Sequence, residues 1–316
     1  MEELILLGKT DIRISRLGLG CWQWGDRVMW SYGKTHTERD TREAFDASLA
    51  AGFNFFDTAE VYGWGRSERL LGQYLRETPP AATPLVVASK FMPLPWRLRK
   101  GSLRSALRAT LRRLQLPRVD LYQIHFPFRP VPLEVWADAL ADALEAGLTR
   151  AVGVSNYGPK QMSRAYETLA KRGVLLASNQ VEYHLLDRGA ERDGLLDLCH
   201  KLGVTLIAYS PLDKGMLTGK YTPETPLRGA RRFMVSKERL RRIQPLIQLM
   251  REIGQAHDGK TPAQVALNWL ISKGTVAIPG AKNARQARDN AGALGWRLAE
   301  SEVSALDAES EKATAK

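Results

Sequence analysis

The stretch VDLYQIHFPFRPVPLEVWADALADALEAGLTRAVGVSN, residues 119–156, contains the repeating unit that decides the fold. It begins with an apolar run (119–126), continues with an amphipathic segment (132–147) and ends with a second apolar run (150–156). Short apolar runs of this kind are typical of strands buried in a parallel sheet, where a helix connects each strand to the next. Gly147 ends the amphipathic segment, at the position expected for a helix C-cap. The stretch therefore predicts one strand–helix–strand unit.

The same unit recurs along the chain. Six further apolar runs of strand length lie at residues 16–22, 53–58, 84–90, 177–183, 204–211 and 275–280. Their starts recur roughly every 30 residues, which is the length of one strand–helix unit. Residues 261–274 carry the signals of a helix, with Thr261 as N-cap, Pro262 at the first helical position and Gly274 beyond the end.

Eight such units predict an α/β fold of the (β/α)8 TIM barrel type. A doubly wound sheet is the alternative, and it would usually carry G-x-G-x-x-G after its first strand. The first apolar run contains GLGCWQWG (18–25) instead, and this breaks the required spacing. We therefore expect the barrel.

Two additions to the barrel are predicted. Residues 3–14, ELILLGKTDIRI, indicate an N-terminal hairpin that turns at Gly8–Lys9 and closes the bottom of the barrel. The seventh and eighth strands are separated by a long insertion, which includes residues 213–235 and a basic helix from Ser236 to about His257. Insertions of this length usually form lids or ligand-binding loops. No linker or low-complexity tract is present, so residues 1–316 are expected to form a single domain.

The net charge of +12 is concentrated in residues 96–114, WRLRKGSLRSALRATLRRL. Leucines at 103, 107 and 111 repeat every four residues, beside a stripe of arginines at 104, 108 and 112. This pattern predicts an amphipathic helix with a solvated face. We do not expect nucleic-acid binding, because no aromatic stacking residues interleave with the arginines and no DNA-binding motif is present.

The chain has the composition of a soluble globular protein, with 44% hydrophobic and 25% charged residues. No apolar run is long enough for a membrane span, and MEELILLGKTD at the N-terminus lacks the basic segment of a signal peptide. The two cysteines, Cys21 and Cys199, are too few for a disulfide framework. We therefore expect a cytoplasmic protein.

Chemistry in such barrels takes place at the C-terminal ends of the strands. Asp57 ends the second strand, Lys90 the third and His125 the fourth, while Tyr62 follows in the loop after Asp57. Taken singly, most of these have a structural explanation, since a lone histidine is more often a core residue than a catalyst. Together they bring a carboxylate, an ammonium, an imidazole and a phenol to one edge of the barrel, and this favours catalysis.

We expect Asp57 to provide the counter-charge for Lys90. The Lys90 ammonium is expected to lower the pKa of Tyr62 from its ordinary value near ~10, so that the phenol can give a proton to a substrate oxygen. His125 would hydrogen-bond to the same oxygen. Reduction of a carbonyl also needs a hydride, which a protein must take from a cofactor. The five histidines are scattered without clustered carboxylates, so we predict no metal site.

At these residues the chain resembles the aldo-keto reductase superfamily, over nearly its whole length. DTAEVYGWGRSE, VVASK, VDLYQIH and VGVSNY resemble the segments that carry the family's aspartate, tyrosine, lysine, histidine and fifth strand. NQVEYHLL, AYSPLDKGMLTGKY and TPAQVALNWL resemble later signatures, and GLGCWQWGDRVMWSYGK is most similar to a cyanobacterial and plastid branch. The resemblance implies that Asp57, Tyr62, Lys90 and His125 are the catalytic residues.

The resemblance also implies NAD(P)(H), bound in an extended form across the mouth of the barrel without a Rossmann fold. Ser155, Asn156 and Gln180 would hold its carboxamide, and Tyr209 would stack on the nicotinamide. The full set of implied cofactor contacts is Trp22, Ser155, Asn156, Gln180, Tyr209, Ser210, Leu212, Gly215, Lys220, Gly280, Lys282, Gln286, Asp289 and Asn290.

The chain departs from many family members after the last strand. Gly280, Ala281 and Gln286 stand where those members have lysine, serine and an arginine that grips the 2′-phosphate. The segment is similar to a branch in which a basic residue two positions after the glycine, here Lys282, pairs with that phosphate, and Arg285 would assist Lys282. We therefore expect NADPH rather than NADH.

Aromatic residues at the barrel edge predict an apolar substrate pocket, with a wall formed by Trp22, Trp30, Trp64, Phe91, Trp96, Phe126 and Phe128. The expected partner is a small-molecule aldehyde or ketone, and the expected state is a monomer or a weak homo-oligomer. Two alternatives stay open at this point: a cofactor-binding regulatory subunit similar to potassium-channel β-subunits, and a metal-dependent barrel hydrolase or lyase.

Overall fold

The computed structural model describes residues 4–79, 83–225 and 235–315. Its main sheet has eight parallel strands, each hydrogen-bonded to the next in chain order. They are β3 (Leu19–Gly20), β4 (Phe55–Asp57), β5 (Val86–Phe91), β6 (Val119–Ile124), β7 (Thr149–Ser155), β8 (Leu176–Glu182), β9 (Thr205–Tyr209) and β10 (Val276–Ala277). Parallel bridges from Leu17 to Ala277 and from Gly20 to Gly280 join the two ends of the sheet and close the barrel. The predicted (β/α)8 barrel is confirmed.

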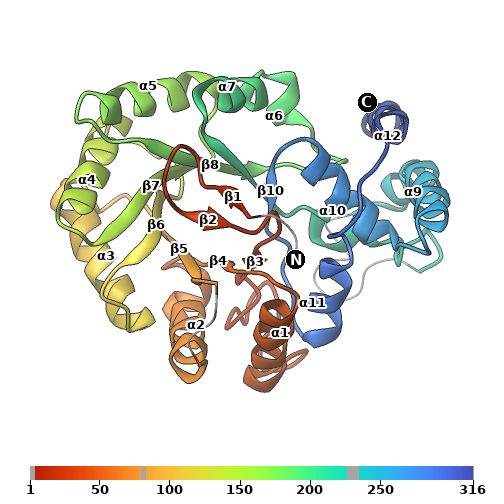
Figure 1. The fold of residues 1–316 in the computed structure, drawn as a ribbon, viewed down its shortest axis with the longest axis horizontal. Helices are drawn as coiled ribbons and strands as arrows, with labels where there is room; N and C mark the ends of the chain where they lie inside the picture. Colours follow the sequence, from red (N-terminus) through yellow and green to blue (C-terminus); the bar gives the residue numbers. More distant parts are fainter. Residues whose placement is uncertain (1–3, 80–82, 226–234, 316) are drawn as a thin grey trace.

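Helices surround the strands on the outside (Figure 1). They are α1 (Glu38–Ala50), α2 (Arg66–Glu77), α3 (Gly101–Leu114), α4 (Leu133–Glu145), α5 (Pro159–Ala170), α6 (Gly189–Arg192), α7 (Leu195–Leu202), α10 (Pro262–Ser272), α11 (Ala284–Ala291) and α12 (Glu300–Thr314). The predicted signals of α10 are confirmed, because the Thr261 side chain accepts a hydrogen bond from the Gln264 backbone N–H and Gly274 has a left-handed φ of 73°.

The N-terminal hairpin covers one end of the barrel (Figure 1). Its strands β1 (Ile5–Leu6) and β2 (Arg13–Ile14) pair antiparallel, and Gly8 in the turn has a φ of 59°. The Gly8 backbone N–H donates to the hydroxyl of Thr205, the first residue of β9, at 2.7 Å. Side chains of the hairpin pack in one apolar cluster with inward-facing residues of the barrel strands. The hairpin therefore closes the N-terminal end, as predicted.

The long insertion lies between β9 and β10. Its described part contains the 3-10 helix η2 (Asp213–Thr218) and the helices α8 (Lys237–Arg242) and α9 (Gln244–Ala256). The prediction of one helix from Ser236 to about His257 is wrong, because two helices meet at Ile243. Pro245 explains the break, since its ring has no N–H to donate to the carbonyl of Arg241 and would crowd that group. Residues 226–234 of the predicted insertion lie outside the described residues.

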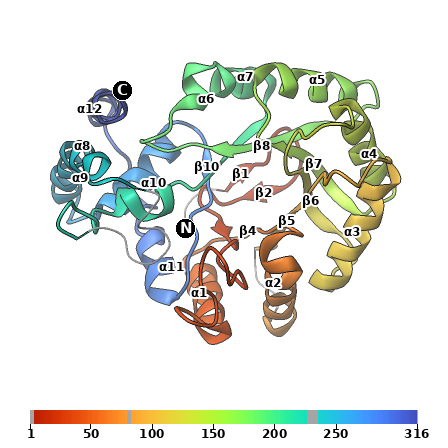
Figure 2. The ribbon, with the colours of Figure 1, turned by 180° about the vertical axis from the view of Figure 1, so that it is seen from behind.

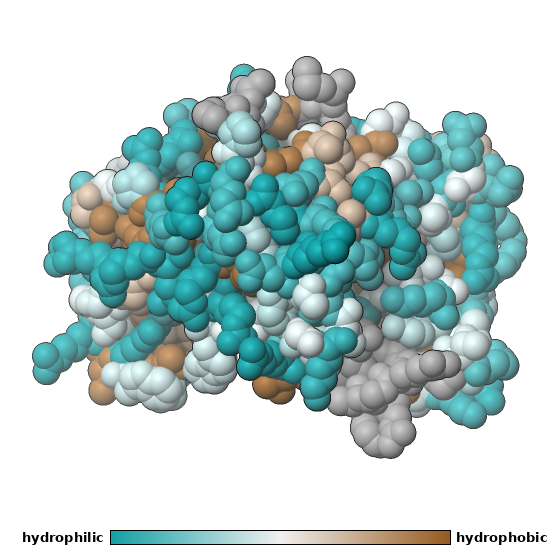
Figure 3. Space-filling model, turned by 90° about the horizontal axis from the view of Figure 1, so that it is seen from below, coloured by the Kyte–Doolittle hydropathy of each residue, from teal (hydrophilic) through white to brown (hydrophobic). Residues whose placement is uncertain are grey.

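The surface charge follows the predicted pattern. On α3 the leucines at 103, 107 and 111 are buried, whereas the arginines at 104, 108 and 112 are exposed. The neighbouring face over α1 and α2 is also mainly hydrophilic (Figure 3). Among the described residues, no helix has both the length and the apolar character needed to cross a membrane.

Candidate active site

A cavity of about 650 Å³ opens at the C-terminal ends of the barrel strands. This end lies opposite the hairpin and faces the reader in Figure 2. Asp57, Tyr62 and His125 line the cavity, and Lys90 lies directly behind them. The structure therefore brings together the three residues predicted at separate strand ends and Tyr62 from the loop after Asp57.

Lys90 and Asp57 form a buried ion pair beneath the cavity. Lys90 is fully buried, and its Nζ donates to Asp57 Oδ1 at 2.5 Å and to the carbonyl of Thr58 at 2.9 Å. The other carboxylate oxygen, Asp57 Oδ2, accepts a hydrogen bond from Gln180 Nε2 at 2.8 Å. Burial lowers the pKa of Lys90, and the adjacent Asp57 carboxylate opposes that change. The carboxylate thus helps to keep the buried amine charged.

Tyr62 begins the 3-10 helix η1 (Tyr62–Gly65). Its hydroxyl lies 3.5 Å from Lys90 Nζ, and its ring stands edge-on to the His125 ring at a centroid distance of 5.7 Å. Burial, followed by the charge of Asp57, raises the pKa of Tyr62 well above its ordinary value. The prediction that the pKa of Tyr62 lies below its ordinary value is therefore wrong, because burial and the Asp57 charge raise it. The phenol stays protonated at neutral pH, as a proton donor must.

The backbone after Tyr62 turns through left-handed conformations. Gly63 has a φ of 54° and Gly65 a φ of 77°, and a Cβ on Gly63 would lie only 2.6 Å from the carbonyl oxygen of Gly25. Only glycine fits such a position without strain. The helix α2 then begins at Arg66, while the Ser67 hydroxyl donates to the carbonyl of Cys21 at 2.8 Å. The glycines therefore allow the sharp turn that separates Tyr62 from α2.

His125 is held as a neutral imidazole. Its backbone N–H donates to the Phe91 carbonyl at 2.8 Å, and its buried Nδ1 has no hydrogen-bond partner among the described residues. Burial, with a smaller contribution from the Lys90 charge, lowers the pKa of His125 to about 3. A neutral imidazole keeps one N–H, which can be donated to a carbonyl oxygen.

The polar residues predicted for the cofactor are linked to one another. Tyr209 donates through its hydroxyl to Asn156 Oδ1 at 2.9 Å, and Asn156 Nδ2 donates to the carbonyl of His125 at 2.9 Å. The Ser155 hydroxyl donates to the Gln180 carbonyl at 2.7 Å. These bonds hold four strand ends, of β6, β7, β8 and β9, in one arrangement beside the catalytic candidates.

All fourteen residues predicted to contact the cofactor line the cavity. Gln180 is the one whose surroundings differ from expectation, because its amide N–H already donates to Asp57. Gln180 therefore also supports the Lys90–Asp57 pair.

The aromatic wall is only partly where it was predicted. Trp22, Trp30 and Phe126 line the cavity, whereas Trp64, Trp96, Phe91 and Phe128 do not. Trp64 and Trp96 are solvent-exposed, at 87% and 73%, because their loops turn them outward. Phe91 is buried against Trp136 on α4. Phe91 follows Lys90 on β5, and successive side chains of a strand point to opposite faces, so Phe91 faces away from the cavity. Phe128 stacks on Phe126.

Sequence reasoning missed several residues of the cavity, among them Gln23, Val61, Lys214, Thr218 and Ala263. Lys214 lies between Leu212 and Gly215, so its position in AYSPLDKGMLTGKY was the signal that could have identified it. Gln23 had no such signal. A Cβ on Gly280 would lie 2.1 Å from Gln23 Nε2, so Gly280 leaves room for this side chain.

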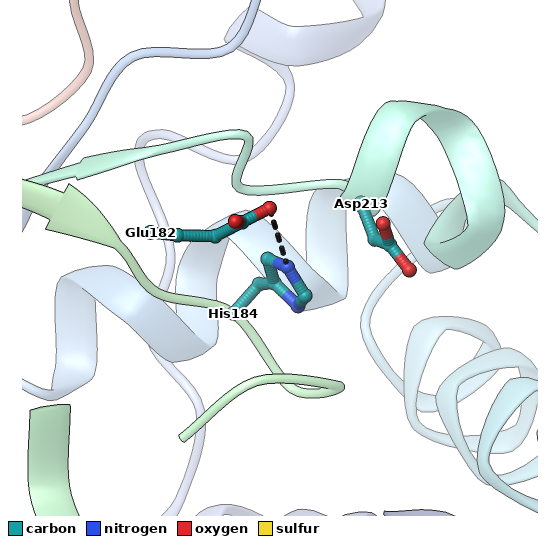
Figure 4. Close-up of side chains that lie close together, drawn as sticks. All are labelled: Glu182, His184 and Asp213. Atoms are coloured by element: carbon teal, nitrogen blue, oxygen red, sulfur yellow. Dashed lines mark ion pairs between the residues drawn. The ribbon is translucent and has the colours of Figure 1, made fainter. Parts of the chain in front are cut away.

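A second cluster has residue types that often bind metals. Glu182, His184 and Asp213 point toward one another from the end of β8, the loop after it and η2 (Figure 4). His184 Nε2 lies 3.6 Å from Glu182 Oε1. The expectation that no histidine has carboxylates clustered around it is therefore wrong, because chain topology brings Asp213 to His184.

The contacts around this cluster are those of an ion-pair network. Lys214 Nζ lies 3.4 Å from Glu182 Oε1, and Arg239 Nη2 donates to Asp213 Oδ2 at 2.7 Å. The Leu186 backbone N–H donates to His184 Nδ1 at 3.1 Å, so the neutral ring carries its proton on Nε2. An imidazole protonated at Nε2 has no lone pair there for a metal. Both carboxylates also already face cations.

Comparison with known proteins agrees with this geometry. The sequence model of the aldo/keto reductase family matches residues 16–311. The chain is 42% identical over 306 residues to the chloroplastic pyridoxal reductase of Arabidopsis thaliana, covering 94% of this chain and 83% of that protein. A thermostable aldo-keto reductase solved with the inhibitor epalrestat aligns with a TM-score of 0.77 and 33% identity, covering 98% of this chain and 100% of the other. Glycerol dehydrogenase from Gluconobacter oxydans aligns with a TM-score of 0.85 and 28% identity, covering 99% and 97%.

Proposed function

The chain belongs to the aldo/keto reductase family, and from this premise we propose that it reduces aldehydes and ketones to alcohols with NADPH, using Tyr62 as proton donor. One observation carries the proposal. A neutral phenol, a buried ammonium–carboxylate pair and a neutral imidazole meet at the edge of one cavity. This arrangement suits protonation of a carbonyl oxygen, because the donor is uncharged and a cation lies beside it.

The cavity has the donor groups that a dinucleotide phosphate requires. Lys214, Lys220, Lys282 and Arg285 all line it, and cationic side chains pair readily with phosphate oxygens. Tyr209 offers an aromatic ring near Asn156 for a flat heterocycle. These residues fit NADPH, whose role when bound is to supply the hydride for the carbonyl carbon.

The residues of the chain supply the rest of the reaction. Tyr62 donates its hydroxyl proton to the carbonyl oxygen, which completes the alcohol. Lys90, whose Nζ lies 3.5 Å from that hydroxyl, stabilises the phenolate that is left. His125 donates its N–H to the same oxygen and orients the carbonyl. Asp57 keeps Lys90 charged and in place through the 2.5 Å contact.

Lys282 is the residue that we expect to distinguish NADPH from NADH. Replacing it with methionine, which keeps the length but not the charge, should weaken NADPH binding by about tenfold, because a charge-assisted hydrogen bond to the 2′-phosphate is lost. NADH binding should change by less than about twofold, since NADH lacks that phosphate. Both dissociation constants are measured by quenching of protein fluorescence.

The matched control is Arg288→Met, because Arg288 is exposed on α11 and does not line the cavity. It should leave both dissociation constants unchanged. Equal losses of NADPH and NADH affinity in Lys282→Met would show that this lysine does not bind the 2′-phosphate.

For the substrate we propose aromatic or apolar carbonyl compounds. Trp22, Trp30 and Phe126 offer flat apolar surfaces beside Tyr62, and the pyridoxal reductase relative carries a name that refers to an aromatic aldehyde. The test is NADPH consumption with a panel of pyridoxal, benzaldehydes, aliphatic aldehydes and ketones. Turnover of none of them would contradict the proposal.

We further propose that the protein acts in the cytoplasm on small molecules, as a monomer or weak homo-oligomer. Both cysteines are free and buried, which suits a reducing compartment.

A further inference from the structure

Lys282 contacts a residue of the substrate wall. Its Nζ donates to the backbone carbonyl of Trp30 at 3.4 Å and lies 5.0 Å from the centre of the Trp30 ring. A cation at this distance over an indole face is attracted to the ring. The side chain proposed to bind the cofactor phosphate therefore also holds an aromatic residue that lines the cavity.

Trp30 is connected to Tyr62 through the ring of Trp22. Its ring stands edge-on to Trp22 at a centroid distance of 5.4 Å, and Trp22 lies 6.1 Å from the ring of Tyr62. All three residues line the same cavity. An unbroken line of side-chain contacts thus runs from Lys282 through Trp30 and Trp22 to the proton donor.

The loop that carries Trp30 is shaped by hydrogen bonds of its own. Within the loop, Asp26 Oδ1 accepts from the backbone N–H groups of Val28 and Met29 at 2.9 and 2.8 Å. The Thr35 hydroxyl donates to the Trp30 carbonyl at 3.1 Å. These bonds lie within the loop. Lys282 contacts Trp30 itself from the segment after β10, where the Ala281 carbonyl also accepts a hydrogen bond from the Trp24 indole N–H at 3.0 Å. A change at Lys282 is therefore expected to alter the position or mobility of Trp30.

We propose that Trp30 is a specificity-determining residue through which Lys282 couples the cofactor 2′-phosphate to the substrate wall. An ammonium has three donors, so Lys282 can bind the phosphate while keeping its contacts with Trp30. The phosphate fixes the ammonium, the ammonium fixes Trp30, and Trp30 with Trp22 presents a preformed surface to an aromatic substrate. This inference rests on the proposed function and goes beyond it, because the 2′-phosphate then strengthens the binding of the substrate as well as the binding of the cofactor.

The experiment compares the KM of an aromatic aldehyde at saturating NADPH and at saturating NADH. Saturation removes any effect of cofactor affinity. In the wild type we expect a KM that is about threefold to fivefold lower with NADPH, which is the size of an exposed cation–π contact. Lys282→Met and Trp30→Leu should both bring the ratio of the two KM values to about one, and Trp30→Phe should keep part of the effect.

Two controls separate coupling from general damage. Arg285→Met removes another cation of the cavity; among the described residues, Lys282 rather than Arg285 makes the cation–π contact with Trp30. This variant should keep the wild-type ratio even if NADPH binds more weakly. A small aliphatic aldehyde that does not reach the wall should give a ratio near one in every variant. A ratio of one for the aromatic substrate in the wild type, or an unchanged ratio in Trp30→Leu, would overturn the proposal.

A second readout does not depend on turnover. Saturating NADP⁺ should quench tryptophan fluorescence more than saturating NAD⁺ does in the wild type, and the difference should vanish in Lys282→Met. Equal quenching in the wild type would overturn the coupling. An absence of turnover with a persisting difference would refute the proposed reaction while supporting the coupling.

Discussion

Tyr62→Phe is expected to lower kcat/KM for carbonyl reduction by about 10²- to 10⁴-fold, the range that a positioned general acid contributes. Within the described part of the chain, the hydroxyl makes one hydrogen-bond contact, a long one of 3.5 Å to Lys90 Nζ, so its removal should disturb the fold little. The dissociation constant of NADPH should stay within about twofold, because the variant removes a proton donor and leaves the cationic part of the cavity intact.

The pH dependence of the wild type provides a check on the same role. Burial and Asp57 raise the pKa of Tyr62 well above its ordinary value, so the phenol remains protonated through the alkaline range. Reduction should therefore not decline between pH 7 and about pH 9 through loss of this proton, since the ordinary phenol pKa is already near ~10. Steady-state rates at saturating NADPH measure this.

The control for Tyr62→Phe is Tyr166→Phe, which removes a phenol hydroxyl from α5, outside the cavity. It should keep full activity. Wild-type turnover in Tyr62→Phe would refute the proton-donor role. A parallel loss of NADPH binding would show that the variant had damaged the site as a whole.

A second large loss of activity is expected when the buried Lys90–Asp57 ion pair is broken. Lys90→Met and Asp57→Asn should each lower kcat/KM by about 10²- to 10³-fold, because one variant removes the cation beside Tyr62 and the other removes the group that holds that cation. Each should also lower the free energy of unfolding by about 3–5 kcal/mol, since it leaves a buried charge without its partner. Denaturant unfolding and steady-state kinetics measure the two effects separately.

The double variant Asp57→Asn with Lys90→Met distinguishes structure from catalysis. It has no buried charge at this position, so its stability should return to within about 2 kcal/mol of the wild type. Its activity should stay as low as that of the single variants. Recovery of activity together with stability would mean that the ammonium has no role in the reaction.

Much of the fold could be predicted because each buried parallel strand leaves an apolar run in the sequence. The eight predicted runs correspond to β3–β10, and the barrel topology then places Asp57, Lys90 and His125 at one end. The positions of these residues thus follow from the order of the strands. The structure agrees with that placement, whereas the catalytic roles stay predictions.

What could not be predicted depends on burial and on loop geometry. The direction of the Tyr62 pKa shift follows from how deeply the phenol is buried, which the motif does not report. Trp64 and Trp96 face solvent because of loop conformations with no periodic signal. Phe91 is different, because its place next to Lys90 on a strand already indicates the opposite face. The contact between Lys282 and Trp30 joins residues 252 positions apart, and no local pattern indicates it.

The proposed reaction depends on hydride transfer to a carbonyl carbon inside this cavity. The most direct test uses NADPH that carries deuterium at both C4 positions of the nicotinamide, with an aldehyde of the panel that is turned over. The predicted result is an alcohol with one deuterium on the former carbonyl carbon for each NADPH consumed. An unlabelled alcohol, or NADPH that binds without being consumed by any carbonyl compound, would contradict the account. The second result would favour a cofactor-binding regulatory protein.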